Sequence, residues 1–235
     1  MTSESGSPQT TAEQWSALLR SAARLQSLVP DAVLVGGTAS ALHAGHRVSF
    51  DHDHVIADLR DRYDSVLEAV EASEGWATSV RASSPPLTLL GSLDGVWAGL
   101  RHLRRTRPLE VEQLDLPEGI LVVPTLEEMI RIKAYLVVRR QMVRDFFDLC
   151  ALSERAGLDS AVAVLTGIDS YYSDRSEQDG SVRSELTLAL ASPQPKDARV
   201  IPQLSEYRGL SPAWQSWDVV AAYCRELAAK LAEAA

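Results

Sequence analysis

The sequence predicts a mixed α/β (α+β) fold, in which a small mixed sheet with flanking helices is followed by a helical C-terminal part. Helical and strand-like segments alternate over residues 11–72, short strand-like runs divided by turn residues fill 76–123, and helical periodicity dominates thereafter. We therefore expect a disordered, Ser- and Thr-rich lead-in at residues 1–10, an α/β core at 11–123 and a helical domain at 124–235.

The core is expected to begin with a helix, because apolar residues recur at helical spacing from Trp15 until Pro30 ends the pattern. A short strand, a short helix, a longer strand and a second long helix are predicted next, at Ala32–Val35, Thr38–Ala44, Val48–Ile56 and Arg60–Ala72. The strand-like runs that follow are Trp76–Arg81, Leu87–Leu90, Val96–Leu103, Leu109–Leu114 and Ile120–Val123. Turn residues such as Pro85-Pro86 and Asp94-Gly95 separate them, which favours a small mixed sheet.

The second half of the chain reads as mainly helical. Pro124-Thr125-Leu126-Glu127-Glu128 is a capping box, which marks the start of a helix, and residues 144–149 lie on a further helix. Residues 157–200 are less regular and are expected to form one helix followed by loops. Ser211-Pro212 opens a last helix.

The overall composition is that of an ordinary globular protein, with 46% hydrophobic and 23% charged residues in 235. No apolar run is long enough to span a bilayer, and the first residues lack the basic and apolar regions of a secretory signal. Cys150 and Cys224 lie far apart in apolar helical contexts, which favours buried reduced thiols over a disulfide. A cytoplasmic protein without membrane contact is expected.

The net charge of −9 argues against indiscriminate nucleic-acid binding, but the charge is distributed unevenly. Residues 101–144 contain nine Lys and Arg against six Asp and Glu. A local basic face on an acidic protein suits a polyanion held at one place. Solvated helix faces with internal ion pairs fit the same count equally well.

Asp51 and Asp53 are the first candidate functional residues. Residues at i and i+2 of a strand point to the same face, so both carboxylates are expected to project together. Mg²⁺ prefers a few carboxylate oxygens together with waters and phosphates, so this pair suits a metal site for phosphoryl or nucleotidyl transfer. The alternative is an acidic pair on an exposed strand, which is common.

Gly36-Gly37-Thr38 comes shortly before these aspartates, at a predicted strand-to-helix turn. Glycines there allow a phosphate to approach the backbone, and the helix N-terminus supplies N–H donors and a positive dipole. A tight turn that needs positive φ explains the glycines as well. No Walker loop or dinucleotide fingerprint is present.

The order of these motifs resembles the AbiEii/MenT-type nucleotidyltransferase toxins, minimal members of the DNA polymerase β-like superfamily. The first matching block is Gly36-Gly37-Thr38-Ala39, Gly45-His46-Arg47-Val48-Ser49 and Asp51-x-Asp53. The second is Ile132-Lys133-Ala134 followed by Arg144-Asp145-Phe146-Phe147-Asp148-Leu149. The resemblance covers about residues 30–155 and implies a polymerase β-like minimal core.

The resemblance also implies roles for individual residues. Asp51 and Asp53 would hold two Mg²⁺ (or Mn²⁺) ions, and Gly36, Gly37 and Thr38 would contact the triphosphate of an NTP. Lys133 would steady phosphate charge, and Asp148 would complete the pocket in preference to Asp145. On residue type alone, Lys133 also suits a surface lysine, and Arg144 could pair with Asp148 along the helix.

The neighbours of the aspartates are further candidates. Arg47 and Ser49 could bind phosphate or fix the turn, and His46 suits a hydrogen bond that stabilises the turn. His52 should point to the opposite face, whereas His54 is a candidate for contact with the site. Full zinc spacing is absent.

A third carboxylate is common on a later strand in the superfamily. The candidates are Glu110 and Glu112, and we take Glu112 as the third metal ligand; if neither reaches the metal, proton removal falls to Asp53 or to phosphate.

The expected activity is transfer of NMP from an NTP to a hydroxyl of an acceptor. By resemblance, the acceptor is RNA, at a tRNA 3′ end, and the protein is the toxin of a toxin–antitoxin system with a cognate antitoxin. Two alternatives stay open: a small-molecule, aminoglycoside-type nucleotidyltransferase, which would need an acidic acceptor pocket, and a catalytically degenerate NTP-binding module.

Overall fold

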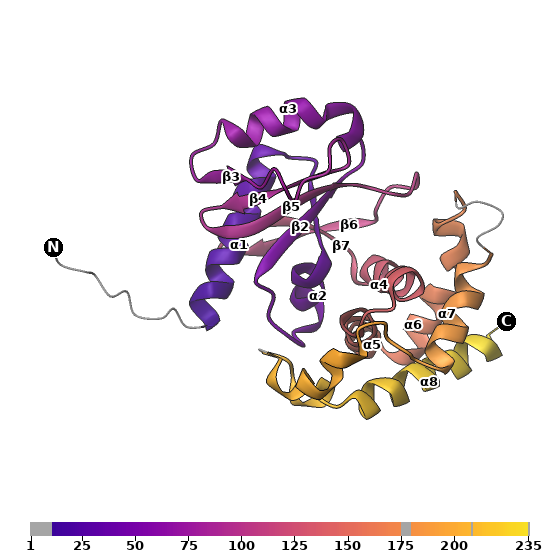
Figure 1. The fold of residues 1–235 in the computed structure, drawn as a ribbon. Coiled ribbons are helices and arrows are strands. Elements are labelled where there is room, and N and C mark those ends of the chain that lie inside the picture. The colour runs from indigo at the N-terminus through magenta and orange to yellow at the C-terminus, as the bar shows by residue number, and fades with distance from the viewer. Residues whose placement is uncertain (1–10, 175–179, 208, 235) are drawn as a thin grey trace.

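The computed structural model describes residues 11–174, 180–207 and 209–234. The lead-in predicted at residues 1–10 lies outside the described residues. The predicted mixed α/β class is confirmed: in Figure 1 a sheet with helices α1 and α3 fills the upper left, and helices α4–α8 gather at the lower right.

The main sheet has five strands in the order β1-β2-β5-β4-β3. Their bounds are Val33–Val35 (β1), Asp51–Ile56 (β2), Val96–His102 (β5), Thr88–Leu93 (β4) and Trp76–Thr78 (β3). Strands β2 and β5 run parallel, with Asp53 opposite Gly99, and the other pairs are antiparallel. The sheet is therefore mixed, as predicted.

One face of this sheet is covered by helices α1 (Thr11–Leu28) and α3 (Leu59–Glu71). Leu25 of α1, Tyr63 of α3 and Leu100 of β5 belong to the same buried apolar cluster. Along β2, His52, His54 and Ile56 are buried on this side, while Asp51 and Asp53 alternate with them on the other. The covered face thus fixes the direction of both aspartates.

Helix α2 (Gly36–Ala44) connects β1 to β2 and begins two residues earlier than predicted. Gly36 has φ +73°, and Gly45 ends the helix in the left-handed region at φ +59°. Both conformations favour glycine, so the sequence sets both ends of this short helix.

The predicted single sheet divides in two. Strands β6 (Val111–Leu116) and β7 (Gly119–Pro124) form a separate hairpin. The side-chain amide of Gln26 in α1 donates to the carbonyl of Val122 and accepts from its N–H, both at 2.8 Å. Gln26 thus satisfies the two backbone groups of Val122 at an edge that no other strand pairs with among the described residues.

The helical part comprises five α-helices and three 3₁₀ segments among the described residues. Their bounds are Leu126–Arg140 (α4), Val143–Ala156 (α5), Leu158–Thr166 (α6), Ile168–Tyr171 (η1), Val182–Ala191 (α7), Ala198–Glu206 (η3), Pro212–Trp214 (η4) and Trp217–Glu233 (α8). Thr125 caps α4 by accepting the N–H of Glu128, as the predicted capping box requires. Helix α7, where loops were expected, begins with Ser181 accepting the N–H of Ser184.

A second apolar cluster joins the helices to the N-terminal unit. It contains Leu18 of α1 and Leu121 of β7 together with Phe147 of α5 and Leu227 of α8. The predicted domain boundary at residue 123 thus falls inside one continuous apolar core. The division of the chain into two domains stays a prediction. Cys150 and Cys224 are free and buried in this cluster, with their sulfur atoms 3.5 Å apart.

None of the helices in the described ranges is both long enough and apolar enough to cross a membrane.

Leu100→Ala should lower the free energy of unfolding by about 3 kcal/mol, because Leu100 is fully buried in the central strand β5 and its removal leaves a cavity. Chemical denaturation measures the loss. Leu188→Ala is the control, since Leu188 is 73% exposed and its truncation should cost less than about 0.5 kcal/mol. Equal losses in the two variants would contradict the assigned core.

Candidate functional site

Strand β2 places Asp51 and Asp53 on the face of the sheet that α1 and α3 leave uncovered. Asp51 is exposed and Asp53 is about one-third exposed, at 32% of its side chain. Both carboxylates are therefore reachable from solvent and lie on one side, in the arrangement that the spacing predicts.

Two glycines leave space around the carboxylate of Asp53. A Cβ on Gly36 would lie 3.5 Å from Asp53 Oδ2, and a Cβ on Gly99 would collide with Asp53 Oδ1. The N-terminal turn of α2 thus adjoins the carboxylate on one side, and β5 adjoins it on the other. A group bound by Asp53 would also meet the backbone of this turn.

Thr38 and Ser49 hold Asp51 in place. The Thr38 hydroxyl donates to the backbone carbonyl of Asp51 at 2.6 Å, and the Ser49 hydroxyl donates to Asp51 Oδ1 at 3.0 Å. The Thr38 side chain is buried, so any contact with a triphosphate would come through its backbone N–H. Contact of Ser49 with phosphate stays a prediction; the described contact orients a carboxylate.

Asp148 of α5 is the centre of a buried charge cluster. Lys133 of α4 reaches Asp148 Oδ2 at 2.7 Å, and Arg47 donates through Nε to Oδ1 at 2.8 Å and through a terminal nitrogen to Oδ2 at 3.0 Å. His46 Nε2 lies 2.7 Å from Oδ1. These three side chains replace Arg144, the helix-surface partner expected for Asp148.

The positive charges of this cluster dominate its electrostatics. Burial alone would raise the pKa of Asp148, but Lys133 and Arg47 outweigh it and hold the pKa well below 3.8. Burial likewise opposes the charge on Arg47, yet Asp148 and, more weakly, Asp51 raise the pKa of the guanidinium. One carboxylate between two permanent cations leaves net positive charge beside Asp51, which suits an anionic ligand.

Arg47 also explains Gly37. A Cβ on Gly37 would collide with the guanidinium of Arg47 and would lie 3.0 Å from Ser49 Oγ. The second glycine of the turn therefore makes room for Arg47 against α2. Direct contact of Gly37 with a triphosphate is a separate prediction.

Glu112 does not join the aspartates. It lies on β6 of the second hairpin, and His43 is 3.9 Å away from it. In the described part of the chain no three His, Cys, Asp or Glu side chains form a group able to hold a metal ion. Because β6 belongs to a different sheet from β2, the structure gives no support to Glu112 as a third ligand, which stays a prediction.

Glu110, the other candidate, is engaged elsewhere. It accepts from Arg131 at 2.8 Å and from the Tyr171 hydroxyl at 2.6 Å, and these hydrogen bonds lower the pKa of the Glu110 carboxyl. Arg107 and Arg131 lie over the Tyr171 ring, at 3.7 and 3.9 Å from its centre. Glu110 thus ties the loop after β5 to α4 and η1.

The basic segment 101–144 is not one free cationic face. At least six of its nine Lys and Arg residues form ion pairs with carboxylates of the chain: Arg101, Arg105, Arg107, Arg131, Lys133 and Arg140. Arg105 and Arg131 share the fully buried Glu128. The charge count alone therefore gives little support to a polyanion site.

His54 lies away from the site, contrary to expectation. Its ring is fully buried against that of His52, with centroids 5.3 Å apart, and its nitrogens have no hydrogen-bond partner among the described residues. His52 Nε2 is 2.9 Å from the Ser21 hydroxyl of α1. Burial lowers the pKa of His52 to about 4 and that of His54 well below 6.5, so both rings are neutral near pH 7.

Sequence reasoning did not single out Arg101 and Gly99 of β5. Arg101 Nε lies 3.2 Å from Asp53 Oδ1. The sequence does show that Trp97, Gly99 and Arg101 share one face of a strand. To place them beside the aspartates, one must also know that β5 pairs with β2.

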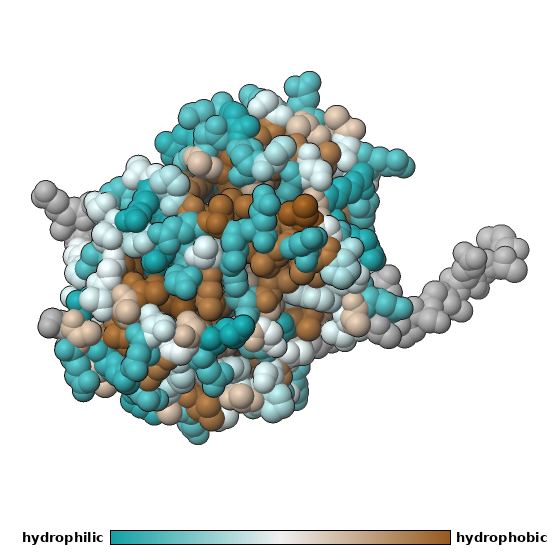
Figure 2. Space-filling view, turned by 180° about the vertical axis from the view of Figure 1, so that it is seen from behind, coloured by the Kyte–Doolittle hydropathy of each residue, from teal (hydrophilic) through white to brown (hydrophobic). Residues whose placement is uncertain are grey.

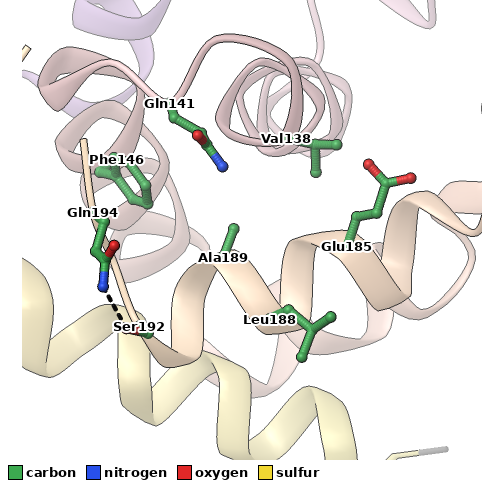
Figure 3. Close-up of a pocket in the computed structure, with 8 residues that line it drawn as sticks. All are labelled: Val138, Gln141, Phe146, Glu185, Leu188, Ala189, Ser192 and Gln194. Atoms are coloured by element: carbon green, nitrogen blue, oxygen red, sulfur yellow. Dashed lines mark hydrogen bonds between the residues drawn. The ribbon is translucent and has the colours of Figure 1, made fainter. Parts of the chain in front are cut away.

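A separate hollow of about 430 Å³ lies between α4, α5 and α7, away from the predicted site residues. Figure 3 shows Val138, Phe146 and Leu188 around it, together with Gln194, which donates to Ser192. Apolar side chains also reach the outer surface in patches on the face seen in Figure 2. None of the predicted site residues lines the hollow.

Comparison with solved structures identifies the fold. The chain matches MenT4, a nucleotidyltransferase toxin from Mycobacterium tuberculosis, with 20% identity over 95% of this chain and 84% of that one, at a TM-score of 0.59. It matches JHP933 from Helicobacter pylori with 17% identity over 97% and 96%, at 0.52. The antibiotic-resistance factor ANT(2'')-Ia matches with 11% identity over 70% and 96%, at 0.51. The chain therefore has a nucleotidyltransferase fold, which it shares with MenT4.

Comparison of sequences gives a different set of relatives, and no family model matches the chain. The heme uptake protein MmpL11 of Mycobacterium tuberculosis is 28% identical over 93% of this chain. MmpL11 of Mycolicibacterium smegmatis, a mycolic acid-containing lipids exporter, is 31% identical over 57%. The chain spans 23% and 14% of the length of these two relatives.

Asp148→Asn should lower the free energy of unfolding by about 3–5 kcal/mol at pH 7, because it leaves Lys133 and Arg47 buried without their counter-charge. The depressed pKa of Asp148 adds a pH signature. Its contribution is complete above about pH 4 and is lost as the pH falls through the depressed value, so the variant should lose this acid dependence. Denaturant titrations from pH 3 to 7 measure both effects.

Asp145→Asn is the matched control on the same helix. Asp145 is equally buried, but its partner Arg140 has a side chain that is 41% exposed and can be hydrated after the change. We expect a clearly smaller loss of stability. A larger loss in Asp145→Asn than in Asp148→Asn would contradict the central position of Asp148.

Proposed function

We propose that the chain is a divalent-metal-dependent nucleotidyltransferase that moves NMP from an NTP onto a hydroxyl of RNA, at a tRNA 3′ end, as the toxin of a toxin–antitoxin system. The observation that carries the proposal is the shared open face of Asp51 and Asp53 beside the N-terminal turn of α2, on a nucleotidyltransferase fold. The antitoxin partner is inferred from the similarity to MenT4.

The residues present fit a divalent cation such as Mg²⁺ (or Mn²⁺). Asp51 and Asp53 offer hard carboxylate oxygens on one side, and the missing side chain of Gly36 leaves space next to Asp53 Oδ2. When bound there, the ion would neutralise triphosphate charge and favour in-line attack at the α-phosphorus.

The chain's own cations are suited to the triphosphate. Arg47 and Lys133 are fixed by Asp148 and buried, so they would add positive potential beside the triphosphate without moving and without touching it. The N–H groups at the start of α2 add hydrogen-bond donors and the positive end of the helix dipole, which attract phosphate as the cations do. The N–H groups would hold the β- and γ-phosphates, which leave as pyrophosphate.

In the proposed transfer, the acceptor hydroxyl oxygen forms a bond to the α-phosphorus while the bond from this phosphorus to the bridging oxygen of pyrophosphate breaks. The hydroxyl proton must leave in the same step. Neither Glu110 nor Glu112 lies with the aspartates, so the proton passes to the carboxylate of Asp53 or to a phosphate oxygen.

The small-molecule alternative is less well supported by the charges at the open face. A polycationic acceptor would require an acidic pocket, whereas Arg101 lies directly beside Asp53. The exposed indole of Trp97 lies opposite Asp51 on β5 and suits stacking with a nucleobase. We therefore retain RNA as the proposed acceptor.

Incubation with α-³²P-labelled NTPs, Mg²⁺ and total RNA should give labelled RNA with the wild-type protein. Asp51→Ala and Asp53→Ala should reduce labelling at least 10²-fold, because the carboxylates that would hold the ion are lost. Gel autoradiography measures the transfer, and parallel reactions with aminoglycosides test the alternative acceptor.

Asp115→Ala is the control, since Asp115 is an exposed strand aspartate of the other sheet and its loss should leave transfer unchanged. Label on aminoglycosides alone would favour the small-molecule reading. NTP binding without any transfer would favour a degenerate module, and full activity of Asp51→Ala would contradict the site.

A further inference from the structure

The strand next to the aspartates carries no third carboxylate. In the parallel register of β2 and β5, Asp51 lies opposite Trp97, Asp53 opposite Gly99 and Val55 opposite Arg101. These three residues of β5 share the face of the aspartates. The side chains nearest to the pair on this strand are thus an indole, a hydrogen and a guanidinium.

A pair of divalent ions would bring four positive charges to this face. Two-metal sites hold their ions about 3.5–4 Å apart, and bridging carboxylates offset the repulsion. Asp51 and Asp53 supply two negative charges, and Arg101 adds a positive one 3.2 Å from Asp53 Oδ1. The net charge of this group of three side chains is therefore only −1, so the side chains on this face offer a second ion neither a further ligand nor much countercharge.

Arg101 is well placed to act as a permanent charge in this position. Its Nε is directed at Asp53 Oδ1, and the absence of a side chain at Gly99 allows Asp53 to lie against β5. The Arg101 side chain is 45% exposed, so the remaining guanidinium donors are open to an incoming anionic group. A fixed guanidinium can neutralise phosphate charge as an ion does.

From this geometry we infer that the site takes one divalent cation, not two, and that Arg101 supplies the positive charge that a second ion would bring. The inference rests on the proposed function and replaces the two ions implied by the family resemblance with one. Arg101 contacts Asp53 through Nε, and its remaining guanidinium donors would face the incoming phosphate.

The count of bound Mn²⁺ tests the inference without any catalytic turnover. Mn²⁺ is titrated into the full chain saturated with an α,β-methylene NTP, and the signal of free Mn²⁺ is followed by electron paramagnetic resonance, with the analogue alone as the blank. One ion per protein–analogue complex is expected for the wild type. Two ions would overturn the inference and leave the proposed transfer intact.

Variants at residue 101 separate its charge from its bulk. Arg101→Glu puts a carboxylate on β5 beside Asp53, and a second Mn²⁺ should then bind. Arg101→Lys should keep one ion. Binding of only one ion by Arg101→Glu, with an unchanged melting temperature, would overturn the assignment of Arg101.

The charge effect can also be measured without nucleotide. Arg101→Gln should raise the affinity for Mn²⁺ about 30-fold, the factor for removing the repulsion between a unit charge and a divalent ion about 4 Å apart in water. Arg104→Gln is the control. Arg104 is an exposed arginine just after β5, and its replacement should leave the affinity for Mn²⁺ unchanged. Equal changes of Mn²⁺ affinity in the two variants would overturn the local role of Arg101. If the wild type neither bound Mn²⁺ nor labelled RNA, the proposed function itself would be contradicted.

Discussion

The buried carboxylate of Asp148 is the interaction on which the geometry of the candidate site depends. It joins three segments that are distant in sequence: the turn before β2 through His46 and Arg47, helix α4 through Lys133, and its own helix α5. A buried ion of either sign is costly alone, so each partner is stable there only while the others are in place. The position of β2 relative to the helical part thus follows from charge as well as from apolar packing.

Strand β2 connects this cluster to the open face. Arg47 lies two residues before Ser49, which donates to Asp51, and Gly37 leaves the space that the guanidinium occupies. The same short stretch therefore fixes a cation on the buried side and two carboxylates on the exposed side. A nucleoside triphosphate has the complementary character, because its phosphates seek cations while its metal ion seeks oxygen ligands.

Much of the candidate site and of the fold around it could be predicted from short-range sequence patterns. The i, i+2 spacing placed Asp51 and Asp53 on one face, and the capping box at Thr125 placed the start of α4. The pairing of strands was less accessible. Glu112 was expected near the aspartates because the superfamily often has a third carboxylate on a later strand, but its strand β6 pairs only with β7, in a sheet separate from that of β2.

Charge partners were the least predictable part. Lys133, Arg131 and Arg105 look alike in sequence, and only the three-dimensional arrangement shows that each is buried against a carboxylate. His54 was a candidate for contact with the site, but the alternation of β2, which the sequence already implies, sends it with His52 to the other side.

The neutral imidazoles beneath β2 have one more consequence. With His52 and His54 uncharged, the underside of the strand contributes no countercharge to the carboxylates above it. The affinity of the aspartates for cations therefore depends on the charged groups on their own side of the sheet and on the buried Arg47, and not on the histidines beneath β2.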